Sequence, residues 1–329
     1  MLKFGLLGAG RIGITHAKAV TTVPGATISA IFDPVDAAAE AAIEITGGKR
    51  ATVEEIMASP DIDGVIIATP TDLHADQIEL AARAGKAIFC EKPIDLSIER
   101  VRQCLNTVKD SGVTLMVGFN RRFDKSFGRL KTEIDNGAVG NIELVQIISR
   151  DPAAPPVDYI KRSGGIFRDM MIHDFDMARW LLGEEITEVS AMGSALTDPA
   201  IANANDYDTA TATLRTRSGK IAVITNSRRA SYGYDQRIEV HGSAGMVQAG
   251  NHRATSVTTA SADGYKTDPL LDFFMERYAD AYKAELQSFV KVLAGEKMAF
   301  PDGQDGLRAL ELANAALAAL ETGKTIMLD

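Results

Sequence analysis

The first third of the chain alternates short apolar runs with segments in which apolar residues recur at helical spacing. The runs are predicted to be strands, and the segments between them helices. Because the runs are apolar throughout, they are typical of parallel strands that crossover helices cover on both faces. The pattern predicts a doubly wound, parallel α/β domain of the Rossmann type. Its expected strands are residues 4–7, 26–32, 64–68, 87–90 and 114–119.

After about residue 122, the pattern changes to segments in which apolar and polar residues alternate. Alternation is typical of strands with one buried face, and a turn such as Ser218-Gly219 suits an antiparallel sheet. A helix that carries His173 and two helical stretches at 272–294 and 306–320 complete the region. The prediction is a Rossmann domain over residues 1–120 and an α+β domain with a large, mostly antiparallel open sheet over residues 121–329. The expected strands of this sheet are 142–149, 188–194, 209–215, 221–227, 236–241 and 246–249.

Composition narrows the class of protein. A length of 329 residues suits two domains, and 46% hydrophobic with 24% charged residues is typical of a folded globular chain. The formal charge of −9 argues against a nucleic-acid partner, and no apolar run approaches the ~20 residues of a membrane-spanning helix. The two cysteines, Cys90 and Cys104, lie in apolar stretches and are interpreted as reduced thiols. The N-terminal run enters a glycine motif with no signal-peptide cleavage pattern, so we expect a cytoplasmic protein.

The glycine motif Gly8-Ala9-Gly10-Arg11-Ile12-Gly13 fits the G-x-G-x-x-G dinucleotide fingerprint. It follows a predicted strand and opens a predicted helix, which is the context that this fingerprint requires. Gly8 permits the tight turn, Gly10 lets the backbone approach a pyrophosphate, and Gly13 lets the helix pack close to the strand. Arg11 and Ile12 begin the helix whose N-terminus faces the phosphates. All five residues are therefore expected to contact the cofactor.

Asp33 follows the second predicted strand, 20 residues after Gly13. A carboxylate there accepts hydrogen bonds from the ribose hydroxyls of a dinucleotide and repels a 2′-phosphate. This position favours NAD over NADP. A plain strand–turn–helix without a ligand is the alternative reading of the motif.

Two further segments follow strands at the same predicted sheet edge, where ligands of doubly wound sheets bind. Glu91 and Lys92 precede Pro93, which can hold a cis bond. The Lys92 cation could hydrogen-bond a substrate hydroxyl and stabilise a developing alkoxide, or it could be a solvated surface lysine. After the preceding strand, Thr69 is expected to contact the cofactor. His74 is expected either to cap the following helix or to contact the dinucleotide.

A histidine with neighbouring carboxylates forms the second dense group. Asp169 and His173 stand at i and i+4 of a predicted helix, and Asp176 follows three residues later. Three interpretations stay open: a general base with its orienting acid, a shared divalent metal ion, or a helix start with a partly buried histidine and surface acids. No third or fourth ligand stands nearby at standard spacing, so no metal is predicted.

Several motifs in register resemble one family, the glucose–fructose oxidoreductase / inositol dehydrogenase family. The motifs are residues 8–13, 91–93, 118–124, 169–174, 227–235 and 280–285, so the resemblance covers nearly the full chain. It implies oxidation of myo-inositol at C2 to the inosose, with NAD as the hydride acceptor, in a metal-free site of a homotetramer. By position, His173 matches the family's proton acceptor, Asp169 the residue that orients the hydroxyl, and Lys92 the cation at the alkoxide.

The resemblance also implies a polar pocket, because each buried hydroxyl of a polyol needs a hydrogen-bonding partner. The residues that match it are Asn120, Arg121, Asp151, Tyr232, Tyr234 and Tyr282, together with Asp169 and His173. Asn120 and Asp151 depart from residues common in the family, so the polyol is less fixed than the chemistry. The alternatives are an NAD-dependent dehydrogenase of scyllo-inositol, D-chiro-inositol or glucose, an NAD-sensing module without catalysis, and a metal-dependent lyase that uses Asp169, His173 and Asp176.

Overall fold

The computed structural model describes residues 1–328 of the chain, which divide into two compact units. Unit 1 consists of Met1–Asp124 and Ala279–Leu310, and unit 2 consists of Lys125–Tyr278 and residues 311–328. In the described part of the chain, no helix is both long enough and apolar enough to cross a bilayer.

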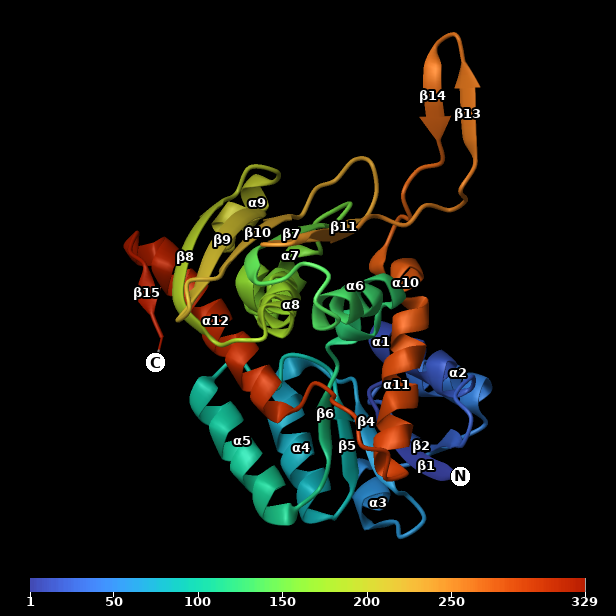
Figure 1. The fold of residues 1–329 in the computed structure, drawn as a ribbon. Coiled ribbons are helices and arrows are strands. Elements are labelled where there is room, and N and C mark those ends of the chain that lie inside the picture. The colour runs from blue at the N-terminus through green and yellow to red at the C-terminus, as the bar shows by residue number, and fades with distance from the viewer. Residues whose placement is uncertain (329) are drawn as a thin grey trace. The chain divides into compact units, whose positions relative to one another are not determined.

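Unit 1 is built on a six-stranded parallel sheet in the order β3-β2-β1-β4-β5-β6. Helices α1, α2 and α11 cover one face, and α4 and α5 cover the other (Figure 1). The strand order reverses between β1 and β4, which is the switch point where doubly wound sheets bind ligands. This confirms the predicted Rossmann-type domain. The elements are β1 Leu2–Leu7, α1 Arg11–Val20, β2 Ala26–Phe32, α2 Asp36–Thr46, β3 Lys49–Arg50, α3 Val53–Ala58, β4 Gly64–Ile67, η1 Thr71–Leu73, α4 His74–Arg83, β5 Ala87–Cys90, α5 Ile98–Ser111, β6 Leu115–Val117, η2 Asn120–Phe123, α11 Ala279–Leu293 and the first part of α12 Gly303–Thr322.

Helix α11 belongs to unit 1, although the sequence pattern assigned it to the second domain. Its Phe289 is fully buried, with ring centroids 5.7 Å from Phe4 of β1 and 5.9 Å from Phe89 of β5. The helix also packs along α1. Burial of this apolar face against the sheet is favourable, so a segment far along the chain completes the core of unit 1.

Unit 2 is built on a seven-stranded sheet in the order β12-β11-β7-β10-β9-β8-β15. All of its pairings are antiparallel except that of β7 with β10, as predicted for a mostly antiparallel sheet. The elements are α6 Lys125–Asp135, β7 Ile142–Arg150, α7 Val157–Ser163, the π-helical turn η3 Ile166–Met170, α8 Ile172–Leu182, β8 Ile186–Ser194, α9 Pro199–Asn203, β9 Thr209–Thr216, β10 Ile221–Ser227, β11 Asp235–Gly242, β12 Gly245–Ala249, β13 Thr258–Ser261, β14 Gly264–Thr267, α10 Phe274–Arg277 and β15 Ile326–Met327.

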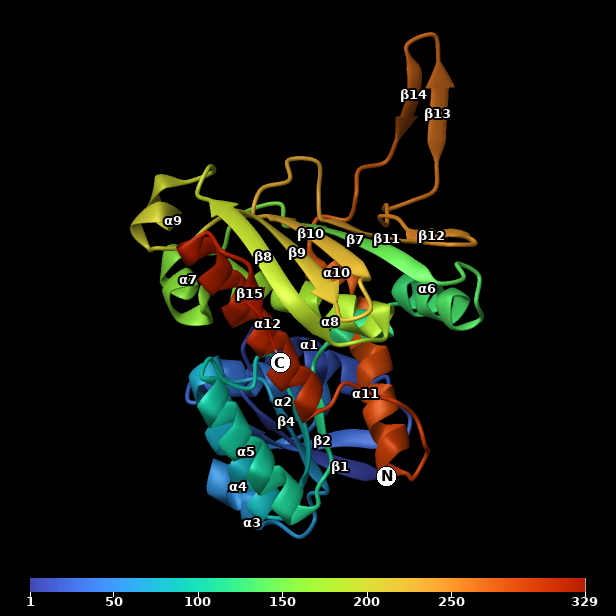
Figure 2. The same cartoon turned by 60° about the vertical axis from the view of Figure 1, so that its left-hand side comes forward.

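One face of this sheet is covered and the other is open. Figure 2 shows α6, α7 and α8 on one side of the sheet, with no described helix lying across the opposite face. Thr211, Thr213 and Arg215 of β9 alternate with buried residues and point away from the covered side. Met192 of β8 and Ile221 of β10 are also exposed. The open face therefore mixes threonines with large apolar side chains.

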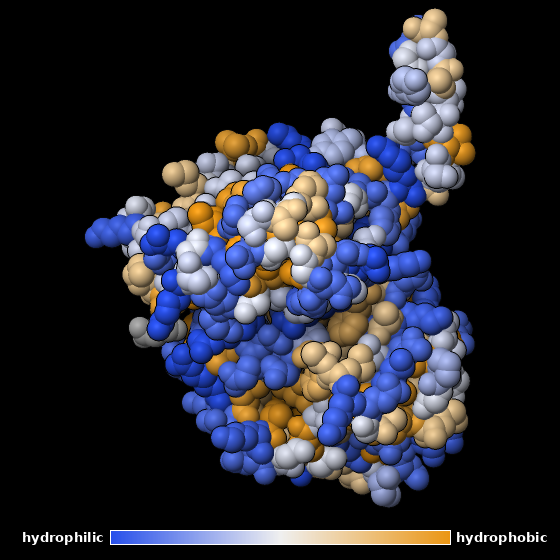
Figure 3. Space-filling view, viewed as in Figure 1, coloured by the Kyte–Doolittle hydropathy of each residue, from blue (hydrophilic) through white to orange (hydrophobic). Residues whose placement is uncertain are grey.

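A two-stranded hairpin, β13–β14, stands clear of the rest of unit 2 (Figure 3). All eight of its strand residues are exposed, and Tyr265 is 85% exposed. The pattern of apolar and polar residues did not predict this hairpin, because neither strand has a buried face to impose alternation.

Candidate active site

The glycine loop between β1 and α1 is shaped by close backbone contacts. Gly8 has φ +89°, and a Cβ on it would lie 2.6 Å from the Ala68 carbonyl oxygen. A Cβ on Gly13 would lie 2.0 Å from the Gly8 oxygen. Both glycines are therefore required by the protein itself, one for the turn and one for helix–strand packing, as the sequence motif predicts.

Gly10 differs from these two glycines because a Cβ on it would meet no atom within 4 Å. Its φ of −67° and ψ of −166° are open to other residues, so the fold does not demand glycine there. Gly10 is also the N-cap of α1, and as a glycine it supplies no side-chain cap to the first N–H groups of that helix. An uncapped helix N-terminus beside open space fits the pyrophosphate of a dinucleotide.

Asp33 lies at the end of β2 and supports the same loop. Its Oδ2 accepts a hydrogen bond from the Ala9 N–H at 2.7 Å, and its Oδ1 accepts one from the Val35 N–H at 2.8 Å. Each carboxylate oxygen retains a second lone pair, so the side chain can also accept hydrogen bonds from ribose hydroxyls. The two backbone contacts orient the carboxylate for that role.

The segment Glu91-Lys92-Pro93 follows β5 and contains a cis peptide bond between Lys92 and Pro93. The Glu91 side chain folds back toward α1 and the Lys92 backbone. Its Oε1 lies 2.8 Å from Nε2 of His16, and its Oε2 accepts a hydrogen bond from the Lys92 N–H at 3.3 Å. Lys92 is half-buried, and its side chain projects from a backbone that the Glu91 side chain holds in place.

His74 links the two segments at this sheet edge. Its Nδ1 lies 2.8 Å from the Pro93 carbonyl oxygen and its Nε2 lies 2.8 Å from the Thr69 carbonyl oxygen. The Thr69 hydroxyl donates to Gln77 Oε1 at 2.7 Å. The ring is 2% exposed, and burial lowers the pKa of His74. Both partners are carbonyl oxygens, so the neutral ring that burial favours can donate a hydrogen bond to the Thr69 loop or to the Pro93 loop, but not to both at once.

The segment that carries Asp169 and His173 is not one continuous α-helix. Asp169 lies in the π-helical turn η3, and His173 lies in α8, which begins only at Ile172. The Met171 N–H donates to the Ile166 oxygen at 2.8 Å, which is the i to i+5 bond of a π turn. The prediction of one regular helix through both residues is therefore wrong, because a π turn with one extra residue precedes α8.

Asp169 and His173 are both half-buried in unit 2. The Tyr159 hydroxyl donates to Asp169 Oδ1 at 2.9 Å, and Nη2 of Arg228 lies 3.9 Å from Asp169 Oδ2. The acids that follow His173 are not surface acids. Asp174 and Asp176 are at most 1% exposed, and Asp174 accepts hydrogen bonds from Ser149 and Asn226 at 2.6 and 2.8 Å.

Arg228, which lies in the motif at residues 227–235, is a buried cation for which the sequence predicted no role. It is 1% exposed, and its Nη2 lies 3.5 Å from Oδ2 of Asp206. Asp206 in turn accepts the Ile166 N–H at 3.0 Å, at the start of the π turn. Arg228 therefore lies between Asp169 and the acid that holds its turn. A charged residue after an alternating strand gives no local signal that it will be buried.

The residues predicted to line a polyol pocket divide between the two units. In unit 1, Asn120 and Arg121 of η2 are 3% and 5% exposed, and the buried Tyr282 of α11 packs edge-on against His16 with ring centroids 5.6 Å apart. In unit 2, the half-buried Asp151 follows β7, and Tyr234 packs edge-on against Tyr278.

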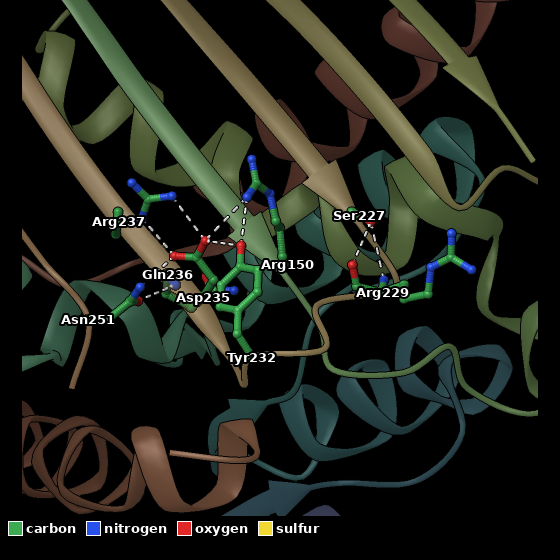
Figure 4. A network of polar contacts seen from close by, with 8 residues as sticks. All are labelled: Arg150, Ser227, Arg229, Tyr232, Asp235, Gln236, Arg237 and Asn251. Carbon is green, nitrogen blue, oxygen red and sulfur yellow. Dashed lines mark hydrogen bonds and ion pairs between the residues drawn. The ribbon is translucent and has the colours of Figure 1, made fainter. Parts of the chain in front are cut away.

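Tyr232 belongs to a charged network at the end of β11 (Figure 4). Its hydroxyl accepts a hydrogen bond from Arg150 at 2.6 Å and donates one to Asp235 at 2.7 Å. Asp235 also binds Arg237 and Asn251. Burial alone would raise the pKa of Asp235, but the hydrogen bonds outweigh it and lower that pKa. The network fixes the Tyr232 ring beside β7.

Comparison with known proteins gives a consistent assignment of both parts of the chain. Residues 2–119 match the oxidoreductase family with an NAD-binding Rossmann fold, and residues 127–248 match the GFO/IDH/MocA C-terminal domain. The chain is 57% identical to inositol 2-dehydrogenase of Rhizobium meliloti over 325 residues, which is 99% of this chain and 98% of the relative.

Two solved structures extend the comparison. A myo-inositol dehydrogenase from Corynebacterium glutamicum superimposes with a TM-score of 0.95 at 46% identity, over 100% of this chain and 99% of that one. The scyllo-inositol dehydrogenase from Lactobacillus casei with bound NAD(H) and scyllo-inositol has a TM-score of 0.92 at 32% identity, over 99% of each chain.

Proposed function

The chain belongs to the GFO/IDH/MocA oxidoreductase family, and from this premise we propose that it oxidises myo-inositol at C2 to 2-keto-myo-inositol with NAD. The observation that carries the proposal is the 57% identity to an inositol 2-dehydrogenase along the whole chain. The open space at Gly10 and the placement of Asp33 support NAD as the cofactor.

The cofactor would be held by unit 1. The N-terminal amides of α1, including those of Arg11 and Ile12, would bind the pyrophosphate, and Asp33 would accept the ribose hydroxyls. Residues at the ends of β4 and β5, Thr69 and Glu91, would form the adjoining edge. When bound, NAD supplies the acceptor for the hydride that leaves the substrate carbon.

The protein's part of the reaction is to move a proton and stabilise charge. We assign His173 as the base that takes the hydroxyl proton, Asp169 as the carboxylate that orients the hydroxyl, and Lys92 as the cation that stabilises the developing alkoxide. Tyr159 and Arg228 hold Asp169, and the Glu91 carboxylate anchors the Lys92 backbone. No metal takes part in this assignment.

The substrate is proposed to contact polar side chains. A cyclic polyol presents a hydroxyl on each carbon, so selectivity for one isomer depends on pairing each buried hydroxyl. The proposed residues are Asn120, Arg121, Asp151, Tyr232, Tyr234 and Tyr282, with Asp169 and His173. The similarity to a scyllo-inositol dehydrogenase makes scyllo-inositol the second candidate substrate.

The test is the appearance of NADH at 340 nm with NAD and a panel of myo-inositol, scyllo-inositol, D-chiro-inositol and glucose. Turnover that is fastest with myo-inositol, and weak when NADP replaces NAD, is the expected result. Preference for another member of the panel would retain the reaction class and replace the substrate. Inactivity on the whole panel by protein that binds NAD would refute the proposed substrate class.

We further propose a cytoplasmic homotetramer. The open face of the unit 2 sheet, with Met192 and Ile221 exposed among threonines, supports assembly through that face. The two cysteines are buried and unbridged, which suits a reducing compartment. Light scattering should give four times the 35.2 kDa of one chain. A monomeric mass would refute the assembly.

A further inference from the structure

Three ionisable side chains lie close together in the interior of unit 1, next to the segment that carries Lys92. His16 of α1 and Glu285 of α11 are 0% exposed, and Glu91 at the end of β5 is 9% exposed. One ring nitrogen of His16 and one carboxylate oxygen of each glutamate lie within 4.8 Å of one another. The group joins three elements that are 75 or more residues apart in the sequence.

The two glutamates differ in their hydrogen bonds. Oε1 of Glu91 lies 2.8 Å from Nε2 of His16, and Oε2 of Glu91 accepts a hydrogen bond from the Lys92 N–H. Neither oxygen of Glu285 receives a hydrogen bond from residues 1–328. Burial, together with the charge of Glu91, raises the pKa of Glu285 well above its usual range. Burial thus favours the protonated, neutral form of the Glu285 carboxyl group.

Other titratable groups stand near the three, among them Lys92 beside Glu91 and the arginines Arg121 and Arg122 of η2, which packs against α11. The rings of Phe89 and Tyr282 pack edge-on against His16 from β5 and α11. Cys90 precedes Glu91, and burial raises the pKa of its thiol, which keeps it neutral. The Glu91 charge also acts on His74, as does Lys92. An ionised Glu285 would place a second buried negative charge beside Glu91. This is energetically unfavourable and favours the protonated form of Glu285.

The distances favour hydrogen bonding over metal binding. Nε2 of His16 and Oε1 of Glu91 are 2.8 Å apart, which is a hydrogen-bond length. Two ligands at ~2.1 Å from a tetrahedral ion would be about 3.4 Å apart. The Glu285 oxygen lies within 4.8 Å of both partners but makes no direct hydrogen bond to either.

Glu91 connects this group of side chains to the segment that carries Lys92. Its Oε2 accepts the N–H of the next residue, Lys92, and its carboxylate lies against Gly118, where a Cβ would be 3.1 Å from Oε2. The side chain is thus clamped between the backbone of Lys92 and the groups below it. A change in the Glu91 rotamer would turn the peptide from which Lys92 projects.

We propose that His16, Glu91 and a protonated Glu285 form a buried positioning network that fixes the direction of Lys92. None of the three is a catalytic residue. The inference rests on the proposed role of Lys92 in the reaction, but the protonation of Glu285 can be tested without any substrate.

The first experiment compares the pH dependence of thermal stability in the wild type and Glu285→Gln. A folded-state pKa above the unfolded value of about 4.3 means that the wild type loses stability as pH rises from 5 to 8, because only the unfolded state releases the proton. Glutamine cannot ionise, so the Tm advantage of the variant should grow by about 2 °C per pH unit. Asp280→Asn, which changes an exposed acid of the same helix, should show no such trend. A constant Tm difference would overturn the neutral Glu285.

The second experiment measures positioning through kinetics. Glu285→Leu should lower kcat by tenfold or more and change the Kd for NAD by less than about twofold, because a misplaced cation affects the reacting centre. Glu91→Gln should lower kcat by a similar factor. Glu285→Gln retains a neutral hydrogen-bonding group and should keep most of kcat. Wild-type kcat in Glu285→Leu would overturn the positioning role, and if that variant does not fold, Glu91→Gln gives the same test. If no polyol is oxidised by the wild type, the proposed function fails, whereas the stability comparison still decides the protonation of Glu285.

Discussion

Substitutions of Gly13 and Gly10, in the loop between β1 and α1, should have different effects. Gly13→Ala should lower thermal stability as well as NAD affinity, whereas Gly10→Ala should lower NAD affinity alone. In Gly13→Ala, the new Cβ would lie 2.0 Å from the Gly8 oxygen, whereas ordinary contact begins near 3.4 Å. The start of α1 must therefore move by about 1.4 Å, a distance that follows from those two values. Because one side of α1 is buried, including His16 and Ala17, the shift also disturbs packing around the helix.

The magnitude follows from the cost of overpacking. Forcing an extra methyl into a packed site costs about 3 kcal/mol at the upper end of its usual range. With an unfolding entropy of about 2.1 cal/mol/K per residue, that cost lowers the Tm of a 329-residue chain by roughly 4 °C. A displacement of ~1 Å at the helix start should also weaken NAD binding, because the amides no longer point at the pyrophosphate.

Gly10→Ala is the matched control, because its Cβ would meet no protein atom within 4 Å. We expect its Tm to stay within about 1 °C of the wild type, since surface-like changes rarely exceed ±0.5 kcal/mol. Its NAD affinity should fall tenfold or more, because the methyl occupies the space through which the pyrophosphate approaches the backbone.

Differential scanning fluorimetry and NAD titration by calorimetry measure both effects on the same samples. Unchanged NAD affinity in Gly10→Ala would show that the loop does not cradle the dinucleotide. Unchanged Tm in Gly13→Ala would show that the close approach of α1 and β1 is not a constraint on the fold.

Four further outcomes follow from the site and the fold. Asp33→Ala should lower the preference for NAD over NADP in kcat/KM by tenfold or more, and an unchanged preference would exclude the ribose role. Lys92→Ala should cut kcat by about 10²-fold or more while NAD binding in titration stays the same, and near-normal turnover would remove it from the reaction. Dialysis against a chelator should leave the rate unchanged, whereas a loss restored by a divalent ion would favour the metal-dependent lyase interpretation. Burial opposes ionisation of Asp208, but four hydrogen bonds, from the N–H groups of Leu196 and Thr197 and the hydroxyls of Thr197 and Thr209, lower its pKa. Its contribution to stability should be present above pH 4 and be lost as pH falls through the lowered value, so the acid-induced fall in Tm should be shallower in Asp208→Asn.

The features that sequence predicted well are those encoded locally. The glycine loop, Asp33 and the five long strands of unit 1 need only short-range spacing and continuous apolar runs. β3, with two exposed residues, escaped prediction because it has no apolar face. The predicted helix over 272–294 is interrupted at Tyr278, where α10 ends and α11 has not yet begun.

The features that sequence missed depend on partners far along the chain. The π turn at Asp169 begins with a hydrogen bond to Asp206, 40 residues away. Glu285 and Arg228 are charged residues whose burial is decided by tertiary packing, so neither periodicity nor motif spacing indicates it. The residues that we propose to position the chemistry were therefore harder to predict than those proposed to perform it.

The discontinuous composition of unit 1 has a consequence for synthesis of the chain on the ribosome. β1 to β6 are translated first, but the core they form includes Phe289, and their buried ionisable group includes Glu285. Until residue 293 has emerged, the nascent sheet leaves the apolar surface that α11 covers open to solvent. We therefore expect a fragment ending near residue 124 to aggregate or bind chaperones rather than to act as an independent NAD-binding domain. The first third of the chain should complete its fold only during synthesis of about the last sixth.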